Sequence, residues 1–116
     1  MNKKSLYARL ASLFAATLLH GAAVADQHTT QALEQAKEAA GSVGDSKAVS
    51  QHATEALKHI EAAKAEAANP GVAKHLEKSE AELQSAVKNA NRFNADTAVE
   101  DAKDAQTHLD EAIHKK

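Results

Sequence analysis

Cysteine and tryptophan are absent from this 116-residue chain, and proline, glycine and aromatic residues are scarce. Without cysteine, no disulfide can stabilise the fold and no thiolate can take part in chemistry. Since only three residues are aromatic, the core must be built mainly from alanine with scattered leucine, valine and isoleucine. The length allows one domain, and we expect its core to be thin.

The first 25 residues have the three parts of a secretory signal peptide. A positive start is supplied by Lys3, Lys4 and Arg9. An apolar run over 10–19 follows, and the small residues at 23 and 25 match a cleavage site before Asp26. A retained membrane anchor is the alternative, but the run is shorter than the roughly 20 residues that a membrane span needs. We therefore expect 1–25 to be a signal peptide and 26–116 to be a periplasmic domain.

Removal of the signal peptide would leave 11 basic and 16 acidic residues, so the mature chain is acidic. Nucleic-acid binding needs a basic footprint, and the remaining lysines form no cluster. Membrane-surface binding needs bulky apolar anchors, whereas the helix faces expected here carry alanine. We therefore expect neither nucleic acid nor, after cleavage, a membrane to be a partner.

Helix formers dominate the chain beyond residue 26, and the residues that end helices fall at 41–44, 69–71 and 91–94. The residues that can cap the following helices are Asp45 or Ser46, Asn69 and Asn94. Pro70 suits a first helical position because its missing N–H is not needed there. The sequence predicts helices over about 28–40, 46–68, 70–90 and 95–114.

Each predicted helix carries a stripe of apolar residues with alternating steps of three and four, as at the a and d positions of a heptad abcdefg. In chain order the stripes are Leu33, Ala36 and Ala40; Val49, Ala53, Ala56, Ile60, Ala63 and Ala67; Val72, Leu76, Ser79, Leu83, Ala86 and Ala90; and Ala95, Ala98, Ala102, Ala105, Leu109 and Ala112. Short connections make neighbouring helices antiparallel. The predicted fold is all-α, an antiparallel up-and-down four-helix bundle built from two helical hairpins.

Histidines concentrate at one heptad position, g, which lies beside the buried stripe. They are His28, His52, His59, His75 and His108. The other g positions hold Gln35, Glu66, Glu82, Asn89 and Asp101, so no lysine interrupts this edge. A solvated surface role is the ordinary interpretation of a helical histidine and fits His114 at position f. Repetition at g instead favours a shared role as ligands.

Helix geometry limits how these side chains could share an ion. His52 and His59 cannot hold one ion between them, because residues seven apart are separated by about 10.5 Å along the axis. Residues three or four apart are close enough, as in Glu55 with His59 and Asp104 with His108. A facing helix could complete such a site.

Counting residues from the turns predicts which side chains share a level of the bundle. Four histidines fall at similar levels near the turn at 69–71, namely His28, His59, His75 and His108. His52 falls nearer the other end, opposite Gln35. We therefore expect one richer and one poorer site, provided that the helix arrangement lets the g edges face each other.

Neutral imidazole is available at pH 7, since the reference pKa of histidine is about 6.5. Sites of nitrogen and carboxylate ligands bind Cu²⁺ above Ni²⁺ and Zn²⁺. The only methionine, Met1, lies in the signal peptide, so a dedicated Cu(I) site is not expected. The residues favour a site for divalent metal ions, with copper first and nickel or zinc as alternatives.

Three stretches resemble the bacterial small metal-binding protein family: HATEALKHIEAA at 52–63, KHLE at 74–77 and DAKDAQTHL at 101–109. The resemblance covers the mature chain. It implies an exported, cysteine-free four-helix bundle that binds divalent metals, copper foremost, and is linked to metal tolerance. The ligands that it implies are His28, His52, His59, His75 and His108. The chain departs from the family pattern at Gln35, Glu82 and Asp101, where further histidines would be expected, so a lower capacity is implied.

The complete predicted ligand set adds four carboxylates to these histidines: Glu55, Glu82, Asp101 and Asp104. Catalysis is not expected, because the chain has no nucleophile beside a base in a glycine-rich turn and no HExxH motif. The alternative function is an exported structural or protein-interaction module in which the histidines are incidental. The sequence leaves the oligomeric state open and is compatible with a monomer.

Overall fold

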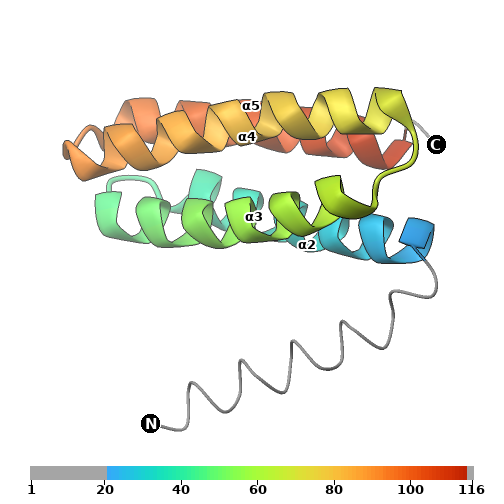
Figure 1. Cartoon of the computed structure of the whole chain (residues 1–116). Coiled ribbons are helices and arrows are strands. Elements are labelled where there is room, and N and C mark those ends of the chain that lie inside the picture. Colours follow the sequence, from blue (N-terminus) through green and yellow to red (C-terminus); the bar gives the residue numbers. More distant parts are fainter. Residues whose placement is uncertain (1–20, 115–116) are drawn as a thin grey trace, which may run out of the picture.

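The computed structural model describes the backbone of residues 21–114 and the side chains from residue 25, and this part of the chain forms four α-helices and no strand. The helices are α2 (Gly21–Gly41), α3 (Ser46–Glu66), α4 (Pro70–Asn91) and α5 (Ala95–His114). Two antiparallel hairpins, α2–α3 and α4–α5, stack as two layers (Figure 1). The prediction of an all-α, antiparallel four-helix bundle is confirmed.

Helix α2 (Gly21–Gly41) extends further toward the N-terminus than predicted, because it already includes Gly21, the first described residue, whereas a start near residue 28 was expected. It runs through the expected cleavage point before Asp26 as continuous helix. Residues 1–20, which hold most of the expected signal peptide, lie outside the described residues, so cleavage stays a prediction. None of the described helices combines the length and apolar character needed to cross a membrane.

The helix ends follow from the residues that cap them. Asp45 caps α3 by accepting from the Ala48 N–H at 3.0 Å, and the Asn69 side chain accepts from the first N–H groups of α4, with Pro70 at its start. Helix α4 ends at the next turn, where Phe93 takes a left-handed backbone conformation with φ 61°. Glycine usually occupies such a position, because a side chain there is strained.

The predicted stripes are buried along α3, α4 and α5, except at their ends, where Ala67, Val72 and Ala95 are only partly buried. Helix α2 buries a wider face than predicted, since Ala32 and Ala39 are fully buried beside the predicted residues. With Ala32 and Ala39 at d, Leu33 and Ala40 move from the predicted stripe to the neighbouring e position. This is the register that places His28 at g.

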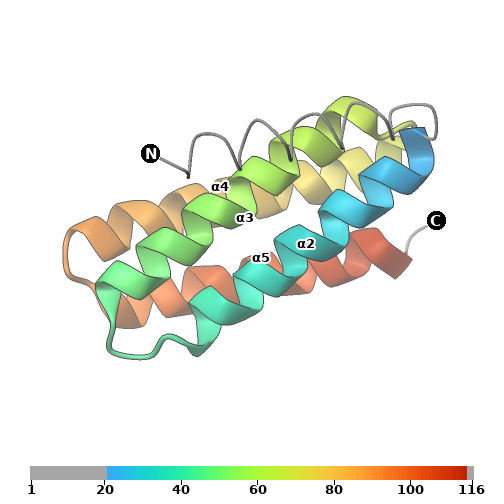
Figure 2. The ribbon, with the colours of Figure 1, turned by 90° about the horizontal axis from the view of Figure 1, so that it is seen from below.

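The order of the helices around the bundle decides which edges meet. Helix α2 packs against α3 and α5, and α4 packs against α3 and α5, so the helices form a ring (Figures 1 and 2). Within each hairpin the g edges face each other, as the contact of His52 Nδ1 with Gln35 Oε1 at 3.0 Å shows. Between hairpins the e edges meet, as in the ion pair of Lys64 Nζ with Glu80 Oε1 at 2.9 Å.

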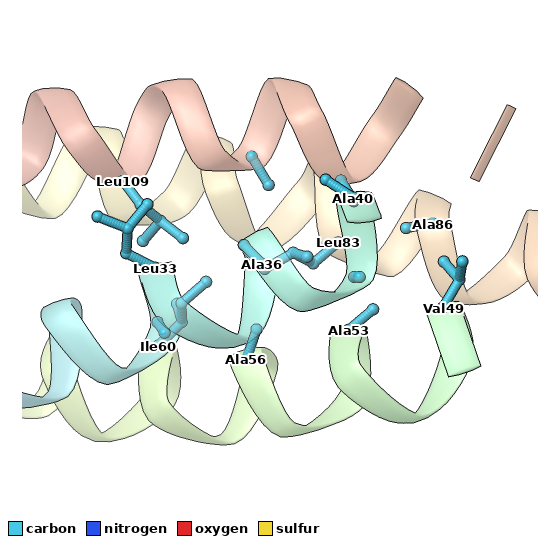
Figure 3. Close-up of a cluster of buried hydrophobic side chains, with 14 of the residues drawn as sticks. Leu33, Ala36, Ala40, Val49, Ala53, Ala56, Ile60, Leu83, Ala86 and Leu109 are labelled. Carbon is cyan, nitrogen blue, oxygen red and sulfur yellow. The ribbon is translucent and has the colours of Figure 1, made fainter. Parts of the chain in front are cut away.

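Some of the few large core side chains lie directly beside the histidines. Ile60, Leu76 and Leu109 are fully buried, and each follows a g-position histidine in the chain. Leu33, Ile60 and Leu109 gather at one level of the bundle (Figure 3). Elsewhere the stripes are mostly alanine. Several of the largest buried side chains therefore pack at the level of these histidines.

Leu83→Ala is expected to destabilise the bundle by about 2–5 kcal/mol, because it empties a fully buried site in a core with few large side chains. This is a large share of the roughly 5–15 kcal/mol that stabilises a typical domain. Urea unfolding of residues 26–116, followed by circular dichroism, measures the change. Val43→Ala is the control, since Val43 is 73% exposed; equal unfolding midpoints for the two variants would contradict the core described.

Candidate metal centre

The facing g edges bring four histidines together as two pairs, one in each hairpin. His28 Nδ1 lies 3.4 Å from His59 Nδ1, with ring centroids 5.6 Å apart and planes inclined by 30°. The rings of His75 and His108 are 6.2 Å apart and inclined by 29°. Because α2–α3 and α4–α5 form opposite sides of the ring of helices, the pairs lie on opposite faces. The four histidines therefore do not converge on one richer site, and that prediction was wrong.

A third ligand joins the pair on α4–α5. Glu111 Oε1 lies 3.3 Å from His108 Nδ1 and 3.8 Å from His75 Nδ1. One donor atom from each of the three residues lies within 4.8 Å of the other two. Glu111 was not among the predicted ligands. Its position three residues beyond His108, where two residues of a helix share a face, is the signal that could have identified it.

The two imidazole nitrogens of this site are left without hydrogen bonds. The Nδ1 atoms of His75 and His108 are both buried, and neither has a hydrogen-bond partner. The Glu111 carboxylate is close enough to form an ion pair with His108, but it is not oriented to accept a hydrogen bond from it. Buried polar atoms are rarely left unpaired. A divalent metal ion would satisfy both nitrogens and the carboxylate, and His₂Glu is an established ligand set for such ions. The residues therefore fit a metal ion.

The next level of α4–α5 carries carboxylates in place of histidines. Glu82, Asp101 and Asp104 each offer an oxygen within 4.8 Å of the others. Asp101 Oδ2 also accepts hydrogen bonds from Ser85 Oγ and Asn89 Nδ2, both at 2.8 Å. Burial, and then the charges of Asp104 and Asp101, raise the pKa of Glu82. These three predicted ligands thus form a group of their own, and oxygen-only ligands suit hard cations better than copper.

Burial favours the neutral form of the histidine pair on α2–α3. Burial lowers the pKa of His28 and of His59, and the charge of His28 lowers that of His59 further, while Gln31 and Glu66 oppose the shift at His28. In the contact between the two Nδ1 atoms, one Nδ1 must donate a hydrogen bond and the other must accept it. The two Nδ1 atoms therefore cannot both carry a proton. Two nitrogens about 2.0–2.1 Å from one tetrahedral ion would be about 3.3–3.4 Å apart. The observed 3.4 Å matches this spacing.

The remaining predicted ligands are arranged less favourably. His52 lies opposite Gln35, as predicted, and the two line a shallow surface hollow with Glu55. Glu55 Oε1 lies 3.4 Å from Lys58 Nζ, and the charge of Glu55 also acts on His59, where it opposes the lowering of the pKa. His114 is exposed, and its Nδ1 lies 2.8 Å from the carbonyl oxygen of Asp110, which agrees with the surface role expected for it.

Comparison with known proteins identifies the family to which this arrangement belongs. The family model described as "Small metal-binding protein" matches residues 3–112. The chain belongs to the small metal-binding protein family. No curated protein and no solved structure matches it. Membership of the small metal-binding protein family implies that the chain binds metal ions. Two groups of residues on α4–α5 bring together side chains that could act as ligands.

The lowered pKa values of His28 and His59 predict how the metal-free protein responds to acid. The unfolded chain takes up protons near the reference pKa of about 6.5, whereas the folded pair takes them up only at lower pH. Stability is therefore present above that value and is lost as the pH falls through the lowered folded values. We expect the melting temperature to fall between about pH 7.5 and about pH 5.5.

Replacing a histidine tests whether the His28–His59 pair causes the decrease in melting temperature at low pH. In His59→Gln the decrease in melting temperature should be smaller, because one of the two imidazoles whose pKa is lowered by folding has been removed. His114→Gln, at an exposed position, should follow the parent chain. Thermal melts of residues 26–116 in chelator-treated buffer test this. An unchanged decrease in His59→Gln would mean that other groups govern the acid response.

Proposed function

We propose that the mature chain binds divalent metal ions in the periplasm, copper foremost, and buffers or sequesters them. The observation that supports this best is the convergence of His75, His108 and Glu111, with two buried imidazole nitrogens that have no hydrogen-bond partner. The periplasmic location is supported by the signal-like residues 1–25. We assign to the chain a role in metal binding rather than in catalysis.

Copper is preferred because of the chemistry of the ligands. Two imidazoles and one carboxylate form a site that binds Cu²⁺ above Ni²⁺ and Zn²⁺ in the usual affinity order. Glu111, whose side chain is 52% exposed, lies on the solvent side of the two buried imidazole nitrogens. Water can complete the coordination, and the ion can enter and leave without unfolding of the bundle. Such exchange is what a buffering protein requires.

Binding should also stabilise the fold. His75 lies on α4 whereas His108 and Glu111 lie on α5, so an ion held by all three joins the two helices of a hairpin. The unfolded chain does not hold these residues together. An ion present at about 100 times its dissociation constant would add about 2.7 kcal/mol to the free energy of unfolding.

Copper titration of residues 26–116 tests the proposal. Cu²⁺ should raise the melting temperature and remain bound through desalting, with a defined stoichiometry measured by atomic absorption. The double variant His75→Ala/His108→Ala should retain less copper and lose most of the increase in melting temperature.

His114→Ala is the matched control, since it removes an exposed imidazole from the same helix as His108 and should behave as the parent chain. If copper neither changes the melting temperature nor stays bound to the parent chain, the proposal is wrong, and the exported interaction module becomes the better explanation. The same titrations with Ni²⁺ and Zn²⁺ would show whether the chain binds copper more tightly than these ions.

A further inference from the structure

Each hairpin repeats one arrangement of three side chains at two levels. The first two side chains are a g residue of the first helix and the g residue that faces it on the second helix. The third is at heptad position c of the second helix, three residues after the g residue of that helix. The four trios are His28, His59 and Ala62; Gln35, His52 and Glu55; His75, His108 and Glu111; and Glu82, Asp101 and Asp104. In three of the four trios the c residue is an acid, and Ala62 is the exception.

The two histidine pairs otherwise resemble each other. Their ring centroids are 5.6 and 6.2 Å apart and their planes are inclined by 30° and 29°. Both lie near the end of the bundle where α3 connects to α4. The clearest difference in donor set is the third residue, which is a carboxylate in one pair and a methyl group in the other. Among the described residues, no carboxylate joins His28 and His59 in a three-residue group like that of Glu111 with His75 and His108. Gln31, a neutral and poor metal ligand, hydrogen-bonds His28, and Glu66 acts on His28 through its charge.

We infer that the carboxylate at position c ranks the two sites, so that Glu111 makes His75–His108 the tighter site and Ala62 leaves His28–His59 the weaker one. This inference rests on the proposed function, since it concerns the order in which metal ions fill the chain. A carboxylate supplies both a third donor and a negative charge against the ion. At low copper the α4–α5 hairpin fills first, and the α2–α3 hairpin fills only as copper rises.

Burial offers a competing explanation, because His28 is only 4% exposed whereas the side chains of His75 and His108 are 15% and 27% exposed. A buried pair could bind weakly because an ion reaches it with difficulty. Substitution at position c separates the two explanations. Ala62 is partly exposed, so a longer side chain at this position can reach along the surface without disturbing the core.

The first experiment removes the carboxylate. The double variant His52→Ala/His59→Ala, made in residues 26–116, leaves the α4–α5 hairpin intact, and isothermal titration with CuCl₂ gives its affinity. Adding Glu111→Gln should weaken binding by at least about 10–100-fold, because losing even a residue that only orients a metal ligand has an effect of this size. Glu100→Gln is the control, because Glu100 is an exposed acid of the same helix paired with Lys103 at 3.9 Å. Circular dichroism verifies that each variant remains helical.

The second experiment supplies the carboxylate where it is missing. In the His75→Ala/His108→Ala background, Ala62→Glu should tighten Cu²⁺ binding at His28–His59 by about 10–100-fold, whereas Ala62→Gln, equal in size but uncharged, should not. If either Glu111→Gln or Ala62→Glu leaves the affinity unchanged, the ranking by position c is wrong, while copper binding by the parent chain would still support the proposed function. If the parent chain binds no copper, both the ranking of the two sites and the proposed function are wrong.

Discussion

The structure depends on the close antiparallel packing of helices through stripes of alanine. Because the stripe residues are small, paired helices approach closely, and the side chains at the edge of each stripe are pushed against those of the neighbour. In both hairpins this edge is the g position, so imidazoles separated by about 30 residues in the chain meet ring to ring. The core itself contributes few large side chains, and several of them lie beside these histidines.

This arrangement explains how a small chain without cysteine can provide ligands for metal ions. Each group of ligands draws on two helices, so it exists only in the folded state, and binding and folding are coupled. The helices also separate the ligands by kind. The two histidine pairs occupy the end of the bundle near the α3–α4 connection, whereas the next level holds His52 with Gln35 on α2–α3 and the cluster of Glu82, Asp101 and Asp104 on α4–α5. The two histidine pairs lie on opposite faces, so each can bind an ion without sharing a ligand with the other.

Much of the fold could be predicted from the sequence, because its signals are local. Asp45 and Asn69 cap helices as expected, and heptad spacing identified the buried stripes of α3, α4 and α5. The helical conformation of residues 21–27 was not predicted, because residues 1–25 were assigned to a signal peptide and left out of the predicted bundle. The register of α2 was also harder to define, because a run rich in alanine offers several equivalent stripes.

The candidate site was only partly predictable for a different reason. A heptad pattern identifies the edge of a helix on which a residue lies, but not the neighbour that this edge meets. The ring order of the helices, which divides the histidines into two pairs, therefore had to come from the tertiary structure. Glu111 was missed because Asp104, on the other side of His108, satisfied the same spacing rule, whereas packing places Asp104 with Glu82 and Asp101 instead.

The most direct test of interhelical metal binding is anomalous diffraction at the copper edge from crystals of residues 26–116 grown with one equivalent of Cu²⁺. We expect the anomalous peak between α4 and α5, within about 2.0–2.2 Å of an imidazole nitrogen of His75, an imidazole nitrogen of His108 and a carboxylate oxygen of Glu111. Copper bound only at His114 or other exposed side chains, with the rings of His75 and His108 uncoordinated, would contradict the assignment.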